Sequence, residues 1–365
     1  MKYDLIVIGG GPAGTAAAIT AAVAGVRVLL LERGGFPRHK VCGEFVSAES
    51  LDLLSSLLAP EQALLNEAVR VSKARLFVDS RVLESAIEPA AASIARFDLD
   101  TSLWHAAQRA GVELCEERAV NTISGNGPFV VTTREETFEA SSVINASGRW
   151  SNLNASALLN GKQKQKWLGL KAHFAETSPP ASVDLYFFDN GYCGVQPVQL
   201  LKGQDGRGRL NVCAMVRADV AMSLEEVFAQ HRSLHERSRN WQRLTTPVTT
   251  SPVSFRKPEA VHGNILMVGD AAGFVDPFVG DGISLALRSG QFAARSLVTF
   301  FRGENTLEEA AGFYRKVYET ELLPVFASSA KVRRLFALPK VIRVGLMFLF
   351  HGAPALTRYL VRKTR

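Results

Sequence analysis

Residues 3–32 read YDLIVIGGGPAGTAAAITAAVAGVRVLLLE. The apolar run at 3–8 predicts a buried strand, and the glycine-rich residues 9–14 that follow predict a tight turn. An alanine-rich stretch at 15–24 predicts a helix, and the second apolar run at 26–31 predicts another strand. A strand, glycine turn, helix and strand within about 30 residues are typical of a dinucleotide-binding fold.

Each glycine of this turn has a separate expected task. Gly9 allows the tight turn, Gly11 lets backbone N–H groups approach a pyrophosphate, and Gly14 lets the helix pack on the strand. Glu32 ends the second strand, where a carboxylate accepts both ribose hydroxyls and repels a 2′-phosphate. The ligand is therefore expected to be FAD or NAD rather than NADP. The residues expected to bind it here are Gly9, Gly11, Pro12, Ala13, Gly14, Glu32 and Arg33.

A second motif occupies residues 269–290, GDAAGFVDPFVGDGISLALRSG. It follows a short apolar run at 264–268, predicted to be a strand, and leads into a predicted helix at 283–301. A carboxylate after a strand can bind ribityl hydroxyls, and glycines before a helix offer N–H donors to a reduced isoalloxazine. The two motifs suit opposite ends of one FAD. The expected cofactor contacts here are Gly269, Asp270, Pro277, Gly280, Asp281, Gly282 and Ile283.

Residues 269–290 resemble the second FAD motif of the para-hydroxybenzoate hydroxylase-type flavoproteins, and the closing Ser-Gly pair resembles the geranylgeranyl reductase branch. Residues 96–100, RFDLD, resemble the family's Arg-x-x-Leu-Asp segment, whose arginine reaches the FAD. Residues 38–44, RHKVCGE, lie where geranylgeranyl reductases have a Cys-Gly motif and flavin halogenases a Gly-Glu-Ser motif. The resemblance implies cofactor contacts from Arg38, Cys42, Gly43 and Arg96.

The resemblance implies an α/β protein with a Rossmann-type, glutathione reductase-like FAD-binding domain formed by residues 1–70, 95–160 and 250–300. An interleaved antiparallel β-sheet substrate domain is expected at 71–94 and 161–249, with predicted strands at 183–188, 194–200 and 210–216. Residues 301–365 are expected to form C-terminal helices that end in a basic tail. A capping box from Thr306 to Glu309 predicts the start of one of these helices.

The resemblance places Cys42 beside the flavin ring, and Cys42 and Glu44 are the candidate catalytic residues. An ordinary thiol is protonated at neutral pH, so Cys42 could give a proton to a carbon that has received hydride from the flavin. The alternative is that Cys42 is a small apolar filler. Glu44 either orients the loop, binds flavin through its carboxylate, or is a solvated loop acid.

The expected function is that of an FAD-dependent oxidoreductase that reduces a C=C bond of a lipophilic isoprenoid or polyketide. The alternatives are a monooxygenase that works through a flavin C4a-hydroperoxide, a halogenase as a distant variant of it, and a non-catalytic flavin- or lipid-binding protein. The monooxygenase and the halogenase use oxygen, whereas the reductase works without it.

Two departures from the family pattern bear on this expectation. Residues 145–149, NASGR, stand where the family has an Asp-Gly pair that helps NADPH to bind, so NAD(P)H is expected to act slowly or through a flavin reductase or ferredoxin. Residues 191–197, GYCGVQP, carry Gly194 where the family has a second aromatic residue. The substrate pocket is therefore expected to be roomier there, with Tyr192, Gln196 and Pro197 as its candidate residues.

The charge pattern argues against a nucleic-acid partner. The chain of 365 residues has a formal net charge of +7, but residues 331–365 hold nine Lys and Arg and no acid, which leaves −2 for the rest. The tail also contains an apolar run at 344–350, too short to span a bilayer. We expect a cytoplasmic protein whose tail either contacts the inner face of a membrane or packs on the body.

No metal site is expected. The four cysteines are scattered without a Cys-x-x-Cys pair, which also favours a reducing compartment. Of the seven histidines, His231 and His235 alone share the i, i+4 spacing of a helical metal pair, and no third ligand is indicated near them. A solvated helix face explains that spacing more simply.

Overall fold

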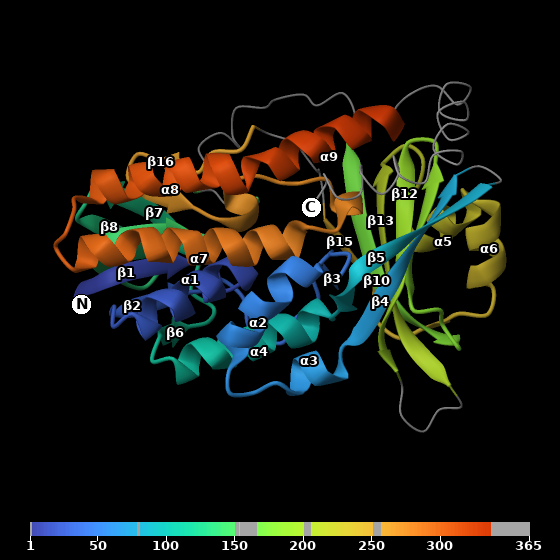
Figure 1. Ribbon diagram of the computed structural model, residues 1–365, viewed down its shortest axis with the longest axis horizontal. Coiled ribbons are helices and arrows are strands. Elements are labelled where there is room, and N and C mark those ends of the chain that lie inside the picture. The colour runs from blue at the N-terminus through green and yellow to red at the C-terminus, as the bar shows by residue number, and fades with distance from the viewer. Residues whose placement is uncertain are drawn as a thin grey trace.

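The computed structural model describes residues 2–78, 81–149, 153, 166–200, 206–250 and 257–336. Their strands form two sheets, which lie side by side along the long axis of the molecule (Figure 1). The apolar run at 344–350 and the side chains of the basic tail lie outside the described residues. Within the described part, no helix is long and apolar enough to cross a membrane.

The first sheet has a parallel core in which β17, β9, β1, β2 and β6 are neighbours in this order. β16 pairs antiparallel with β17, β8 with β9, and β7 with β8. The chain runs from β1 to β2 and β6 on one side, then returns to β9 and β17 on the other. In sheets of this kind, ligands bind at the carboxyl ends of the strands, at the point where the strand order reverses. In this sheet that point lies beside β1. The strands are β1 (Lys2–Ile8), β2 (Val28–Leu31), β6 (Glu113–Cys115), β7 (Val120–Gly125), β8 (Phe129–Thr133), β9 (Thr137–Asn145), β16 (Val261–His262) and β17 (Ile265–Met267).

Helices cover this parallel core because its strands are apolar on both faces. All four residues of β2 are buried, and α1 packs against both α7 and α4. The predicted unit of strand, glycine turn, helix and strand is confirmed, with β2 starting two residues later than expected. The helices are α1 (Pro12–Val23), α2 (Leu51–Leu58), α3 (Ala63–Glu67), α4 (Arg96–Arg109), α5 (Leu224–Ala229), α6 (Arg232–Ser238), α7 (Gly282–Phe301), α8 (Leu307–Glu321) and α9 (Leu323–Phe336), with 3₁₀ turns η1 (Ala48–Ser50), η3 (Gly269–Ala271) and η4 (Pro277–Val279).

The predicted capping box at the start of α8 is present. The Thr306 hydroxyl accepts a hydrogen bond from the backbone N–H of Glu309 at 3.2 Å, and the Glu309 carboxylate accepts one from the N–H of Thr306 at 2.8 Å. These two contacts satisfy donors that the first turn of a helix leaves free. The helix therefore begins where the sequence predicted.

The second sheet is largely antiparallel and follows the order β14-β10-β13-β12-β11-β4-β5-β3, with β15 on β10. Its one parallel pair among the described strands joins β11 to β4. The three predicted strands are confirmed as β11, β12 and β13, whereas β4, β5 and β10 were missed. The strands are β3 (Phe45–Val46), β4 (Val69–Val78), β5 (Arg81–Ser93), β10 (Trp167–Thr177), β11 (Ser182–Phe188), β12 (Gly191–Leu200), β13 (Arg207–Arg217), β14 (Gln242–Arg243) and β15 (Val248–Thr250).

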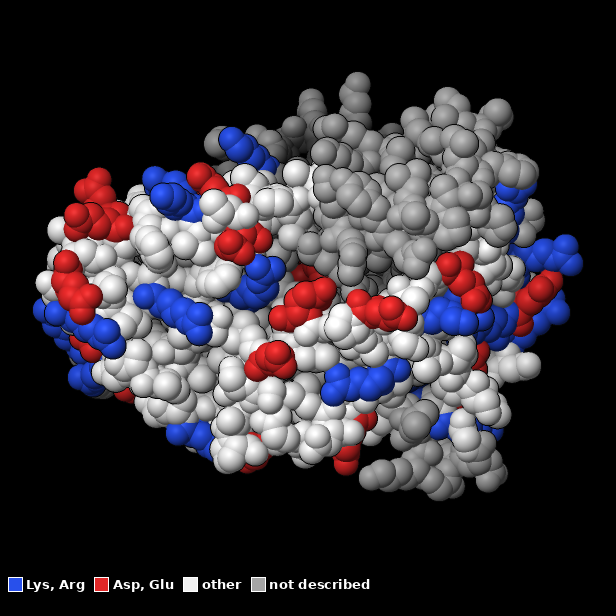
Figure 2. All heavy atoms as spheres, viewed as in Figure 1, with Lys and Arg blue, Asp and Glu red and all other residues white. Residues whose placement is uncertain are grey.

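The two faces of the second sheet have different neighbours. The outer face carries an apolar core that includes Leu170, Ala172 and Phe174 of β10 and residues of α5 and α6. The inner face is the opposite face, which carries Lys171 and His173 of β10. Both side chains contact Glu44. On the described part of the surface in Figure 2, acidic and basic side chains are interspersed over both halves.

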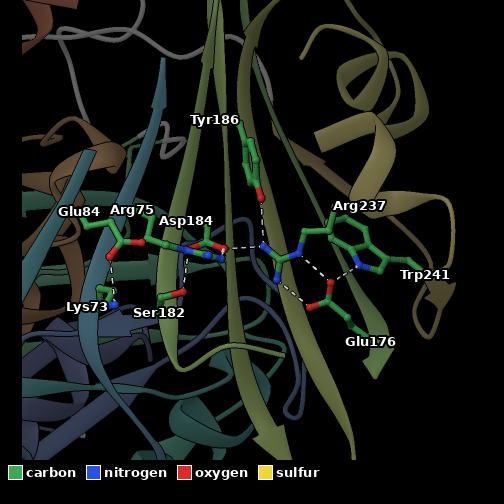
Figure 3. A network of polar contacts seen from close by, with 9 residues as sticks. All are labelled: Lys73, Arg75, Glu84, Glu176, Ser182, Asp184, Tyr186, Arg237 and Trp241. Atoms are coloured by element: carbon green, nitrogen blue, oxygen red, sulfur yellow. Dashed lines mark hydrogen bonds and ion pairs between the residues drawn. The ribbon is translucent and has the colours of Figure 1, made fainter. Parts of the chain in front are cut away.

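A polar network fastens α6 to the outer face of this sheet (Figure 3). The fully buried Asp184 accepts hydrogen bonds from Arg75 Nε at 2.7 Å, from the Ser182 hydroxyl at 2.7 Å, and from Arg237 of α6. Arg237 also donates two hydrogen bonds to the Glu176 carboxylate, both at 2.7 Å. The carboxylate of Asp184 therefore balances two arginines from different elements.

We expect Asp184→Asn to lower the free energy of unfolding by about 3 kcal/mol, because removing one partner of a buried ion pair leaves the other charge uncompensated. Lys73→Met is the matched control. Lys73 and Glu84 form an ion pair in the same region, but both side chains are 51% exposed, so its loss should cost less than about 1 kcal/mol. Urea unfolding of the two variants checks the difference, and equal effects would contradict it.

Candidate active site

The glycine turn after β1 is set by contacts that leave no room for a side chain. A Cβ at Gly9, whose φ is +107°, would lie 2.3 Å from the carbonyl oxygen of Ala146. A Cβ at Gly14 would lie 1.8 Å from the carbonyl oxygen of Gly9. At Gly11 the nearest described atom is Arg96 Nη2 at 3.8 Å. Gly9 and Gly14 are therefore needed for packing, whereas Gly11 faces open space.

The first turn of α1 points at this open space. The helix begins at Pro12, and among the described residues no side chain caps it at Gly11 and no acid lies in its first turn. Free N–H groups and the positive end of the helix dipole attract an anion to such a helix start. The turn is thus suited to the pyrophosphate of a dinucleotide.

Glu32 is held as a carboxylate at the end of β2. It accepts hydrogen bonds from the N–H of Gly10 at 2.8 Å, the N–H of Gly34 at 2.9 Å, and Arg38 Nη1 at 2.7 Å. Burial alone would raise its pKa, but the Arg38 guanidinium and the two N–H groups outweigh burial and lower the pKa to about 2. The carboxylate stays ionised and able to accept ribose hydroxyls.

The second motif is fastened to the first through α7. The Ser289 hydroxyl accepts a hydrogen bond from the N–H of Gly269 at 2.9 Å, which fixes the start of η3. A Cβ at Gly290 would lie 2.1 Å from the carbonyl oxygen of Ala13, so α7 touches the first turn of α1. These contacts bring Asp270 to the same space as the glycine turn.

A cavity of about 770 Å³ lies where the two motifs and the inner face of the second sheet meet, within the usual size of a ligand pocket. Most of the predicted site residues line it. They are Gly9, Gly11, Pro12, Ala13, Glu32, Arg33, Arg38, Cys42, Gly43, Glu44, Arg96, Tyr192, Gly269, Asp270, Pro277, Gly280, Gly282 and Ile283.

The structure places four predicted site residues away from the cavity wall. Gly14 serves packing, and Asp281 is the buried residue that precedes α7. Gln196 is also buried and donates a hydrogen bond to the Ser93 hydroxyl, and Pro197 lies beside a bulge in β12. Gln196 and Pro197 therefore lie beside the described cavity rather than on its wall, and their role in a substrate pocket stays a prediction.

The expected extra room at Gly194 is also absent from the described cavity wall. A Cβ at Gly194 would lie 3.3 Å from Leu185 Cδ2, so the side chain of the neighbouring strand fills the space. Gly194 itself does not line the cavity. Leu185 of β11 therefore occupies the space beside Gly194.

Cys42 lies at the cavity wall in a loop held from two sides. Asn211 of β13 donates hydrogen bonds to the carbonyl oxygens of Cys42 at 3.0 Å and of Gly43 at 2.8 Å. The N–H of Glu44 points at Cys42 Sγ at 3.3 Å. Burial raises the pKa of the thiol, although the nearby Arg96 guanidinium opposes this. The thiol is therefore protonated at neutral pH, as a proton donor must be.

Glu44 is not a solvated loop acid, so that interpretation is wrong. Its side chain is fully buried, and its carboxylate contacts Lys171 Nζ at 2.7 Å, His173 Nε2 at 2.8 Å and the N–H of Arg96 at 2.9 Å. Burial alone would raise its pKa, but His173 and Lys171 outweigh it and lower the pKa. An ionised carboxylate has no proton to give, so this geometry suits a residue that orients the loop.

Arg96 starts α4 beside Cys42 and lines the cavity, as its predicted contact with FAD requires. Its guanidinium makes a bidentate contact with the fully buried Asp100, with distances of 2.6 and 2.7 Å. Asp100 lies one turn further along α4, and this bidentate contact fixes the orientation of the Arg96 guanidinium. The Asp of the predicted Arg-x-x-Leu-Asp segment thus orients its arginine.

Sequence reasoning missed Lys171, His173, Asn211 and Arg149 as site residues. Arg149 lies with its guanidinium carbon 3.8 Å from the ring centroid of Phe274 and its Nε 3.8 Å from the Asp270 carboxylate. The signal for Lys171 and His173 was present, because they alternate with apolar residues over 170–174 as in a strand with one polar face.

The two histidines considered as a metal-binding pair, His231 and His235, lie in different environments. His231 is buried against the rings of Tyr186 and Phe77, whereas His235 is exposed on α6. Among the described residues, no group of three or more His, Cys, Asp or Glu is placed to hold a metal ion. The i, i+4 spacing here reflects one core residue and one surface residue.

Comparison with known proteins decides the family, because the profile of the FAD binding domain family matches residues 2–311. The chain belongs to this family. It is similar to the digeranylgeranylglycerophospholipid reductase of Methanocella arvoryzae, with 27% identity over 86% of this chain and 82% of the relative. It is also 24% identical to a flavin-dependent halogenase of Armillaria mellea, over 90% of this chain and 72% of the relative. A solved flavin-dependent brominase shares the fold, with a TM-score of 0.79, 17% identity, and 100% and 93% of the two chains covered.

The protein is thus an FAD-dependent oxidoreductase with a mixed α/β fold, as predicted, and its cavity fits the cofactor. The uncapped start of α1 suits the pyrophosphate, the ionised Glu32 suits the ribose, and Asp270 suits the ribityl hydroxyls. The open space above Gly11 leaves room for close approach of a phosphate.

Gly290→Ala should weaken FAD binding at least tenfold, because a Cβ there meets the backbone of α1 and pushes the two motifs apart. Gly312→Ala in α8 is the matched control, since no described atom lies within 4 Å of its Cβ. That change should leave FAD binding unaltered and add up to about 1 kcal/mol of stability through helix propensity. Flavin fluorescence titration and thermal unfolding measure both effects, and unchanged affinity in Gly290→Ala would refute the argument.

Proposed function

We propose that this oxidoreductase reduces a C=C bond of a lipophilic substrate of the isoprenoid or polyketide type. The observation that carries the proposal is a protonated thiol, Cys42, at the wall of the FAD cavity beside a guanidinium. The similarity to a reductase that acts on geranylgeranyl lipids supports the same reading. Tyr192, Met215 and Phe274 give the cavity an apolar wall that suits such a substrate.

FAD held by the glycine turn, Glu32 and Asp270 would, once reduced by the electron donor, supply the hydride for one carbon of the double bond. Cys42 Sγ supplies the proton for the other carbon. Its raised pKa keeps the thiol protonated at neutral pH, so the proton is available for transfer. Arg96 stabilises the thiolate that remains, because the guanidinium lies close to the sulfur. Tyr192 is buried at the cavity wall, and its ring helps to exclude water from the reacting carbons.

The electron donor is proposed to be a partner flavin reductase or ferredoxin rather than NADPH itself. Ser147 and Gly148 stand in place of the family's Asp-Gly pair, and the Asn145 side chain accepts hydrogen bonds from the N–H of Ser147 at 3.1 Å and from its hydroxyl at 2.6 Å. The amide oxygen is thereby turned toward its own loop. It carries no charge with which to orient a nicotinamide cofactor.

Enzyme whose FAD has been reduced by light should convert a polyprenyl or polyketide alkene to its reduced product without oxygen, in a single turnover. Reoxidation of the flavin and mass spectrometry of the product measure this. The similarity to a halogenase supports a second candidate, an oxygen-dependent hydroxylation or halogenation. Product that forms only after oxygen is admitted would favour that candidate and overturn the reductase.

Cys42→Ala should slow product formation by about 10²- to 10⁴-fold, the usual cost of losing a proton donor. FAD binding should change far less than the rate, because the glycine turn, Glu32 and Asp270 are unaltered. Cys115→Ala is the matched control, since Cys115 is a half-buried thiol that does not line the cavity. Single-turnover rates of the two variants test this prediction. Equal rates would show that Cys42 serves packing and is not the proton donor.

A further inference from the structure

Glu44 adopts a backbone conformation that needs support. Its φ is +60°, in the left-handed region that residues other than glycine, asparagine and aspartate seldom adopt. Its carbonyl oxygen accepts a hydrogen bond from the N–H of Ile94 at 2.9 Å. The turn formed by residues 42–44 is therefore held in a strained shape by its surroundings.

The side-chain partners of Glu44 come from a strand far away in the sequence. Lys171 and His173 lie two residues apart in β10, so both point to the inner face of the second sheet. Oε1 of Glu44 accepts from Lys171 Nζ at 2.7 Å, and Oε2 pairs with His173 Nε2 at 2.8 Å. All three side chains are at most 1% exposed. Water does not screen these contacts, so losing one of them costs more free energy than losing the same contact at the surface.

Several titratable groups surround this cluster. Glu44 is ionised and pairs with the Lys171 ammonium, while His39 faces His173 with 5.3 Å between their ring centroids. Burial, together with the Lys171 ammonium, lowers the pKa of His39, which therefore stays neutral at pH 7. Arg209 and Asp98 lie at the edge of the cluster with opposite charges. Removing the lysine charge would leave a buried carboxylate uncompensated.

The cluster is connected directly to the reactive thiol. The backbone N–H of Glu44 points at Cys42 Sγ, and the Oε1 atom that binds Lys171 also accepts the N–H of Arg96, whose guanidinium lies near the same sulfur. We propose that Lys171 and His173 are positioning residues, which hold the turn of Cys42 and Glu44 against the FAD cavity by clamping the Glu44 carboxylate. The effect on product formation rests on the proposed function, whereas the position of the turn does not.

Amide hydrogen exchange of the FAD-bound enzyme reports on the turn itself, because the N–H groups of Glu44, Ile94 and Arg96 all bond to atoms of the turn. Lys171→Met should speed exchange of these amides at least tenfold. Asp184→Asn is the matched control, since it removes a buried charge partner from the outer face of the same sheet. It should destabilise the protein without selective exchange at the turn.

Two further variants keep the test decisive if Lys171→Met folds poorly. His173→Gln retains a donor near the position of Nε2 and should exchange within about threefold of wild type, whereas His173→Leu should exchange at least tenfold faster. Exchange in Lys171→Met and His173→Leu that matches Asp184→Asn would overturn the positioning role.

Single-turnover product formation separates this inference from the function on which it draws. Fast exchange at the turn with a rate lowered at least tenfold, in enzyme that keeps its FAD, supports both. Fast exchange with an unchanged rate supports the positioning role and contradicts Cys42 as the proton donor. Slow exchange with a lowered rate contradicts the positioning role and leaves the proposed reaction standing.

Discussion

The packing of α7 on the first turn of α1 is the contact on which the cofactor site depends. Gly290 brings α7 so close to Ala13 that a Cβ would lie 2.1 Å from its carbonyl oxygen. Ser289, one residue earlier, holds the N–H of Gly269 at 2.9 Å. Two motifs more than 250 residues apart thereby become one wall, with a helix start for phosphate and a carboxylate for the ribityl chain. A single added methyl group would separate them.

Both halves of this wall could be predicted from the sequence because each is encoded by consecutive residues. Strand, glycine turn and helix follow one another in each motif, and the glycines have to be where the backbone comes close. The environment of Glu44 could not be predicted this way. Its partners Lys171 and His173 are 127 and 129 positions away, and an acidic letter in a loop is usually solvated. Burial depends on a pairing of distant segments that no local pattern contains.

The missed strand β10 shows why charged residues inside a sheet are easily misread. Lys171 and His173 interrupt its apolar pattern, which hid the strand, yet they alternate with Leu170, Ala172 and Phe174. The apolar residues face α5 and α6, and the polar ones face the loop of Cys42. A period of two is the property of a strand that separates two environments, and here neither environment is water. Alternation, rather than apolar content, was the informative signal.

The second sheet therefore holds buried ion pairs on both faces, and they do different things. On the outer face, Asp184 balances two arginines and ties α6 down, at a distance from the cavity. On the inner face, Glu44 bonds to β10 through its side chain and to Ile94 through its backbone. Glu44 therefore contacts β10, the start of α4 and the thiol of Cys42 at the same time. Cys42 lies between the two sheets, so contacts from the second sheet also set the position of its thiol in the FAD cavity.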